Sequence, residues 1–117
     1  MTNDDATPAI DAKALLDRCG NNADLARRLA GRFIREAPAQ VAVMHDVLRG
    51  GNTAELARLL HKLRGSLGIF GATVAHETAA ALEERARSTA PAECESMLAD
   101  LESEVRRACD ELAVFGS

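Results

Sequence analysis

The sequence contains neither tryptophan nor tyrosine, and phenylalanine occurs only three times in 117 residues. Proteins that bind single-stranded nucleic acid need aromatic rings on which bases stack and basic residues clustered along a groove. Here the basic residues are interspersed with acidic ones, and the formal net charge is −4. We therefore expect no binding to nucleic acid. Because aromatic and β-branched residues are scarce beside alanine and leucine, the composition favours helices over sheets.

Long hydrophobic runs are also absent from the sequence. No apolar stretch approaches the roughly 20 residues of a membrane-spanning helix, and the first residues lack the apolar core of a signal peptide. We therefore expect a cytoplasmic protein without membrane contact. A chain of 117 residues is long enough for one domain with a single core.

Cysteine is scarce and follows no recognisable pattern. Cys19, Cys94 and Cys109 are odd in number and lack the Cys-x-x-Cys spacing of zinc sites. We expect neither a metal site nor a disulfide framework. Cys94 lies on a helical apolar stripe, where a buried free thiol is the usual outcome.

The first part of the chain predicts a loose segment followed by a short helix. Residues 1–9 are polar with one proline and are expected to form a flexible N-terminal arm, so that residues 10–117 form the domain. Asp11 is the expected N-cap of a short helix that reaches Cys19. Either Asn21 or Asn22 then caps the next helix.

Four longer segments carry apolar stripes at helical spacing. The first contains Pro38, but its stripe stays in register beyond the proline, which predicts one kinked helix. Asn52 opens a second helix that lasts until about Ile69. A third helix is expected over 73–87 and a fourth from Pro91 onward. Four such stripes with short connections predict an all-α fold, an antiparallel four-helix bundle preceded by a short N-terminal helix.

His61 is the most informative residue of the chain. On a helical wheel it points roughly 130° away from a stripe of four leucines, namely Leu56, Leu60, Leu63 and Leu67. Its neighbours one turn away are Ala57 and Gly65, and Gly68 extends the same strip. A glycine inside a helix costs roughly 1 kcal/mol relative to alanine. We therefore interpret Gly65, Gly68 and Ala57 as small residues that keep the imidazole accessible.

The same segment resembles the central motif of histidine phosphotransfer (HPt) domains, which reads roughly His-x-Leu-Lys-Gly-Ser and then Gly-Ala. The matching residues are His61, Leu63, Gly65, Ser66, Gly71 and Ala72. Arg64 stands where the family usually has lysine, and Leu67 stands where a small residue is usual. We interpret Leu67 as a packing variation. The resemblance covers about residues 10–112 and includes residues 11–16, residues 33–38 and the pair Leu82-Glu83.

This resemblance implies a phosphorelay carrier. His61 would accept a phosphoryl group from an aspartyl phosphate on a response-regulator receiver domain and pass it to another receiver, and a hybrid sensor histidine kinase is a further expected partner. A neutral imidazole nitrogen is a nucleophile, and Arg64 could offset phosphoryl charge with planar donors. Lys62 would add to the positive electrostatic potential around the phosphoryl group, and Arg58 lies about one turn before His61 on the same helix. The carrier needs no cofactor of its own, because the receiver supplies the Mg²⁺.

The competing hypothesis is a helical docking or dimerisation module that does no chemistry. Ile34 and Val43 lie off the main stripe of their helix and, with Arg58, would contact a partner under either hypothesis. The small residues around His61 favour the carrier, because an adhesive surface would gain area from larger side chains. We expect a monomer.

Two further patterns in the sequence concern the glycines after His61 and the two other histidines. The glycines at 65, 68 and 71 do not have the spacing of a phosphate-binding loop, so we expect a phosphotransfer intermediate rather than an autonomous kinase. His45 and His76 are expected to be ordinary surface or boundary residues. A metal pair of His61 and His76 stays open, but no carboxylate or cysteine spacing supports it.

Overall fold

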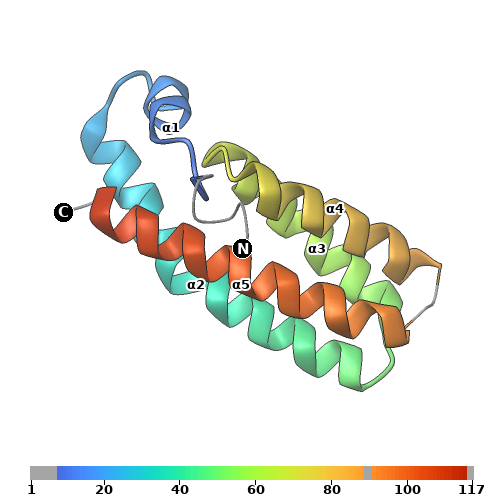
Figure 1. The fold of residues 1–117 in the computed structure, drawn as a ribbon. Helices are drawn as coiled ribbons and strands as arrows, with labels where there is room; N and C mark the ends of the chain where they lie inside the picture. Colours follow the sequence, from blue (N-terminus) through green and yellow to red (C-terminus); the bar gives the residue numbers. More distant parts are fainter. Residues whose placement is uncertain (1–7, 89–90, 116–117) are drawn as a thin grey trace, which may run out of the picture.

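Four long helices run side by side, alternately up and down, and a short helix lies at one end of them beside the turn between the second and third long helices (Figure 1). The computed structural model describes residues 8–88 and 91–115. Its helices are α1 (Ala12–Arg18), α2 (Ala23–Arg49), α3 (Thr53–Ile69), α4 (Thr73–Arg87) and α5 (Pro91–Phe115). The described residues contain no strand. The predicted all-α fold, an antiparallel four-helix bundle with a preceding short helix, is confirmed.

The packing order of the long helices determines which surfaces of the bundle are free. α3 packs against α2 and α4, and α5 packs against the same two helices. α3 and α5 therefore lie diagonally across the bundle. All four leucines of the α3 stripe are buried, including Leu67, which is fully buried as its position on the stripe predicted. None of the described helices is long and apolar enough to cross a membrane.

Polar side chains begin the first three helices where the sequence predicted helix starts. The Asp11 carboxylate accepts a hydrogen bond from the Ala14 N–H, and the Asn52 side chain accepts one from the Glu55 N–H. Asn22, rather than Asn21, caps α2. α2 also continues through Pro38 as one helix, because the apolar stripe on both sides of the proline packs into one core.

The expectation that residues 1–9 form a flexible arm is wrong for Ala9, which lies at the end of this segment that the structure describes. Ala9 is buried, and its N–H lies 2.8 Å from the Glu111 Oε2 atom on α5, while the Ile10 N–H donates to Oε1 of the same carboxylate at 3.1 Å. Residues 1–7 lie outside the described residues. The local composition around Ala9 does not reveal this contact, because its acceptor is about one hundred residues away in sequence.

Gly71 connects α1 to the turn between α3 and α4. Its φ is +61°, and a Cβ there would lie 2.6 Å from the Cβ of Asp11. The Asp11 N–H donates to the Phe70 carbonyl at 2.9 Å. Both the left-handed backbone and the close approach of Asp11 therefore require glycine. The glycine of the Gly-Ala pair in the motif is therefore explained by its backbone conformation and by its contact with Asp11, without a role in phosphoryl transfer.

The three cysteines are free thiols. Cys19 and Cys94 are buried, and Cys109 is half-buried. Burial raises the pKa of the Cys94 thiol and of the Cys109 thiol. Their reactive thiolate forms are therefore suppressed at neutral pH.

Candidate functional site

His61 projects from the middle of α3 with 71% of its side chain exposed. Its Nδ1 atom lies 3.3 Å from the Oε2 atom of Glu83 on α4. This places the Nδ1 edge of the ring toward α4 and leaves Nε2 as the nitrogen for an incoming group. The predicted exposure of His61 is confirmed.

Glu83 is the centre of the charge arrangement around His61. Its side chain is only 5% exposed, because it lies next to the core residue Leu82 on the part of α4 that faces α3. Arg64 Nη1 donates to Oε1 at 2.8 Å, and Arg87 Nη2 donates to Oε2 at 2.6 Å. Three cationic or potentially cationic side chains thus meet one buried carboxylate.

The charge of Glu83 follows from two opposing effects. Burial raises the pKa of the Glu83 carboxyl, but the hydrogen bonds from Arg87 and Arg64 outweigh burial and hold the pKa below its ordinary value. Glu83 is therefore ionised at neutral pH. An ionised carboxylate can only accept hydrogen bonds, so it favours the His61 tautomer with the proton on Nδ1. The lone pair is then on Nε2.

The contact between His61 and Glu83 is longer than a typical hydrogen bond of 2.7–3.2 Å. Contacts of this kind in uncomplexed sites often tighten only when charge develops in the reaction. A positive charge developing on the imidazole during attack by Nε2 would strengthen its attraction to the carboxylate. Glu83 can therefore hold and orient the ring while the reaction proceeds.

The structure places Arg64 beside His61 but pairs it with Glu83. The Arg64 Nε atom is buried and has no hydrogen-bond partner among the residues described. A buried donor without a partner costs about 1–3 kcal/mol. Because the atom is buried, a phosphoryl oxygen could satisfy this donor only after a movement of the Arg64 side chain.

Sequence reasoning missed Glu83 and Arg87 as site residues. The family resemblance included Glu83 only within the pair Leu82-Glu83 and assigned it no role. It did not include Arg87. The available signal was the four-residue spacing between Glu83 and Arg87, which lets the two side chains pair on one helix face. Their position beside His61 depends on how α4 lies against α3.

The small residues predicted to give access differ in their surroundings. A Cβ added at Gly65 or at Gly68 would meet no atom within 4 Å, which means that packing does not require glycine there. Ala57 is buried in the core, so the prediction that it lines the approach to His61 is wrong. α3 packs against two neighbouring helices, and its buried arc is therefore wide enough to include Ala57.

Lys62 is exposed and lines a hollow between α2 and α3, together with Ser66. It therefore lies on the side of α3 away from Glu83. Arg58 is exposed and pairs with Glu55.

The two apolar residues proposed for partner contact behave differently. Val43 is 49% exposed, which leaves its side chain available to a partner. Ile34 is half-buried and packs against the core. Ile34 therefore contributes to the packing of the bundle and offers less of its side chain to a partner than Val43 does.

The two other histidines lie apart from the Glu83 cluster. His45 Nε2 is 3.1 Å from the Glu102 Oε1 atom and links α2 to α5. His76 lines a shallow hollow with Gly68 and Arg18. Within the part of the chain that the structure describes, no group of three or more His, Cys, Asp or Glu side chains could hold a metal ion.

An accessible imidazole on a helical bundle, with guanidinium groups beside it, is suited to carrying a phosphoryl group. A model of the Hpt domain family matches residues 28–113, and the chain therefore belongs to this family. Hpt domains have a histidine phosphotransfer role in phosphorelays, where they work with response-regulator receiver domains. Residues 11–16, part of the resemblance, lie outside the matched residues. Comparisons with curated proteins and with solved structures find no match.

Replacing Gly65 with leucine is expected to slow phosphoryl transfer about tenfold or more, because misplaced reacting groups carry costs of that order. Leucine would stand one turn from His61, in space that is empty in the structure. The free energy of unfolding should not fall, since leucine has the better helix propensity. Transfer kinetics and urea unfolding of the variant test both statements.

Gly68→Leu is the graded control for Gly65→Leu, because Gly68 lies two turns from His61 and also has open space. Its effect on transfer should be smaller. A Gly65→Leu protein that loses stability but transfers at the wild-type rate would contradict the access interpretation.

Proposed function

We propose that His61 is the phospho-accepting residue of this Hpt domain, and that it takes the group from an aspartyl phosphate on one receiver and passes it to another. The observation that carries this proposal is the exposed imidazole whose Nδ1 atom contacts the buried, ionised Glu83. The Nε2 lone pair attacks phosphorus, the bond between phosphorus and the aspartyl oxygen breaks, and the carboxylate leaves with the bonding electrons. The Nδ1 proton stays on the ring beside Glu83.

Arg64 and Arg87 supply positive charge for the phosphoryl oxygens. Both guanidinium groups are anchored on Glu83 at 2.8 and 2.6 Å, so they are held close to His61 before the reaction. Phosphoryl transfer proceeds through a loose transition state whose charge lies on the peripheral oxygens, and positioned cations stabilise it. Arg64, with its unpartnered Nε, is the group we expect to move toward the phosphoryl group.

The proposal assigns no metal to this chain. The Mg²⁺ that offsets charge on the aspartyl phosphate would belong to the receiver. The protein would act as a monomer and as an intermediate carrier, and a hybrid sensor histidine kinase would be a further partner. The competing hypothesis of a module without chemistry loses its basis, because membership of the family implies phosphotransfer.

Incubation with a panel of purified, ³²P-phosphorylated receiver domains tests the proposed function. We expect at least one receiver to transfer label to the protein, with the acid-labile, base-stable behaviour of phosphohistidine. Unlabelled second receivers added afterwards should remove the label. Base-labile incorporation, or incorporation outside His61, would overturn the assignment.

Replacing Arg64 with alanine is expected to slow transfer about tenfold, equivalent to about 1.4 kcal/mol of barrier, or to shorten the lifetime of phospho-His61. Acceptance should persist, because the imidazole is still present. Arg64→Lys should retain most of the function, since a single positive charge can still stabilise the phosphoryl oxygens. Kinetics of the three proteins with one receiver distinguish these outcomes. An alanine variant equal to wild type in both rate and lifetime would make Arg64 an ordinary surface residue.

A further inference from the structure

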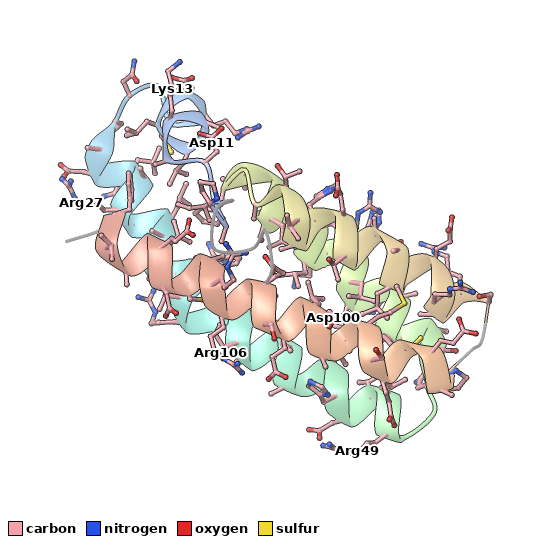
Figure 2. The ribbon with its side chains drawn as sticks, viewed as in Figure 1. Asp11, Lys13, Arg27, Arg49, Asp100 and Arg106 are labelled. Carbon is pink, nitrogen blue, oxygen red and sulfur yellow. The ribbon has the colours of Figure 1, made fainter. Side chains whose placement is uncertain are left out.

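Glu83 is a buried carboxylate with two guanidinium partners, Arg64 and Arg87. Several exposed arginines instead pair with a carboxylate of their own helix on the outside of the bundle, and the examples labelled in Figure 2 are Arg27, Arg49 and Arg106. Within residues 8–88 and 91–115, Arg64 and Arg87 form no ion pair besides those with Glu83. With a neutral imidazole, the cluster therefore holds one positive charge more than the carboxylate neutralises.

The two arginines contact different oxygen atoms of Glu83. Arg87 Nη2 lies 2.6 Å from Oε2, which is the oxygen that the His61 Nδ1 atom contacts at 3.3 Å. Arg64 Nη1 lies 2.8 Å from the other oxygen, Oε1. The Arg64 side chain can therefore leave Glu83 without disturbing the oxygen atom that orients His61.

The two arginines are also held in different ways. Arg87 lies four residues after Glu83 on α4, which is the favourable order for an ion pair on one helix, so this pair does not depend on α3. Arg64 reaches Glu83 across the contact between α3 and α4, and its buried Nε has no hydrogen-bond partner in the part of the chain that the structure describes. It lies three residues after His61 on the same helix. Arg64 is therefore the partner that is better placed to move to a phosphoryl group on His61.

The burial of Glu83 requires that one guanidinium group stays beside it. Burial raises the pKa of the Glu83 carboxyl, and the hydrogen bonds from Arg87 and Arg64 are what hold that pKa below its ordinary value. A buried charge that loses its partner is strongly destabilising. Arg64 can therefore leave Glu83 only while Arg87 remains.

We infer that phosphorylation of His61 moves Arg64 from Glu83 to the phosphoryl oxygens, while Arg87 stays on Glu83. Arg87 is then a positioning residue, because it acts through Glu83 and does not contact the phosphoryl group. The inference rests on the proposed function, since it needs a phosphoryl group on His61. It follows that the two arginines can replace each other as partners of Glu83 in the unphosphorylated protein but not in the phosphorylated protein.

Urea unfolding of single and double variants tests this exchange in the unphosphorylated protein. Arg64→Gln and Arg87→Gln should each lower the urea midpoint only slightly, because the other arginine still neutralises Glu83. The double variant should lower the midpoint by more than the sum of the two single effects. A double variant whose effect equals that sum would show that the two arginines do not replace each other, and would overturn the inference.

Transfer from the receiver that labels the wild-type protein fastest tests how Arg87 acts. Arg87→Gln should slow transfer about fivefold, within the range for neighbouring groups that act together. Arg87→Lys should restore most of the rate, since an ammonium group also neutralises Glu83. In a Glu83→Gln background, Arg87→Gln should slow transfer no further, whereas Arg64→Gln still should. Equal slowing by Arg87→Gln in both backgrounds would mean that Arg87 does not act through Glu83, and would overturn the inference.

Arg85→Gln is the matched control for Arg87→Gln. Arg85 is an exposed arginine of the same helix, but it pairs with Glu93 on α5 at 3.0 Å and not with Glu83. Its replacement should leave transfer at the wild-type rate. If Arg85→Gln slowed transfer as much as Arg87→Gln does, a general loss of positive charge would explain both effects and the inference would be wrong.

A small phosphodonor separates failure of this inference from failure of the proposed function. Phosphoramidate should label His61 of the wild-type protein directly, and ¹H–¹⁵N spectra recorded before and after labelling follow the two arginines. The Nε–H signal of Arg64 should shift on labelling, and that of Arg87 should stay nearly in place. If His61 is labelled but the Arg64 signal does not move, the exchange is wrong and the proposed function stands. If neither phosphoramidate nor a receiver labels His61, the proposed function itself is wrong.

Discussion

His61→Gln is expected to abolish labelling by phosphorylated receivers and to change the free energy of unfolding by no more than about 0.5 kcal/mol, as is usual for surface substitutions. The side chain is 71% exposed and points away from the leucine stripe. Glutamine is polar and uncharged but has no nucleophilic nitrogen that can carry the group. Receiver-dependent ³²P incorporation and thermal unfolding measure the two effects.

His76→Gln is the matched control for the loss of His61. His76 is half-buried on α4 and lies outside the Glu83 cluster. Its replacement should leave labelling intact. If the His61→Gln protein were labelled at the wild-type rate, another residue would be the acceptor and the assignment would fail.

Glu83→Gln is expected to slow transfer about 10- to 100-fold, by analogy with the range for losing a carboxylate that orients a metal-bound histidine. The amide has nearly the same shape but no charge, so it neither favours the Nδ1–H tautomer nor stabilises a developing imidazolium. ¹⁵N spectra of the His61 ring should show the Nδ1–H tautomer in wild type and a mixture in the variant. A merely structural role of Glu83 would leave these spectra unchanged.

Glu83→Gln should also lower the free energy of unfolding at pH 7 by about 1–3 kcal/mol, because Arg64 and Arg87 lose a buried partner. The folded state lowers the pKa of Glu83, so its stabilising contribution is complete above the unfolded value of about 4.3. This contribution is lost as the pH falls through the folded pKa. The difference between wild type and variant should therefore be constant near neutrality and shrink in acid.

Urea unfolding at pH 7 and at about pH 3 measures this dependence, since the lower pH lies below the unfolded pKa of a glutamate. Glu84→Gln is the control, because Glu84 is the neighbouring carboxylate on α4 and is exposed. It should affect neither transfer nor stability. A Glu83→Gln deficit that is the same at both pH values would mean that the ionisation of Glu83 does not cause the effect.

The bounds of the helices could be predicted because local signals determine them. The side chains of Asp11 and Asn52 accept backbone hydrogen bonds within their own first turns, and α4 covers the predicted residues 73–87. The exposure of His61 was predictable for a related reason. Helical periodicity alone placed it opposite the leucine stripe.

The sequence by itself therefore determined the helices, the bundle and the accessible histidine, since these depend on contacts within one helix or on its apolar stripe. Only the tertiary structure decided that Ala57 is buried, that Glu111 holds the backbone of Ala9, and that Glu83 joins His61 to two arginines. These contacts bring together residues 19 or more positions apart, except for the pairing of Glu83 with Arg87 on one helix. Such contacts depend on how one helix lies along another, and the periodicity of a single helix does not contain that information.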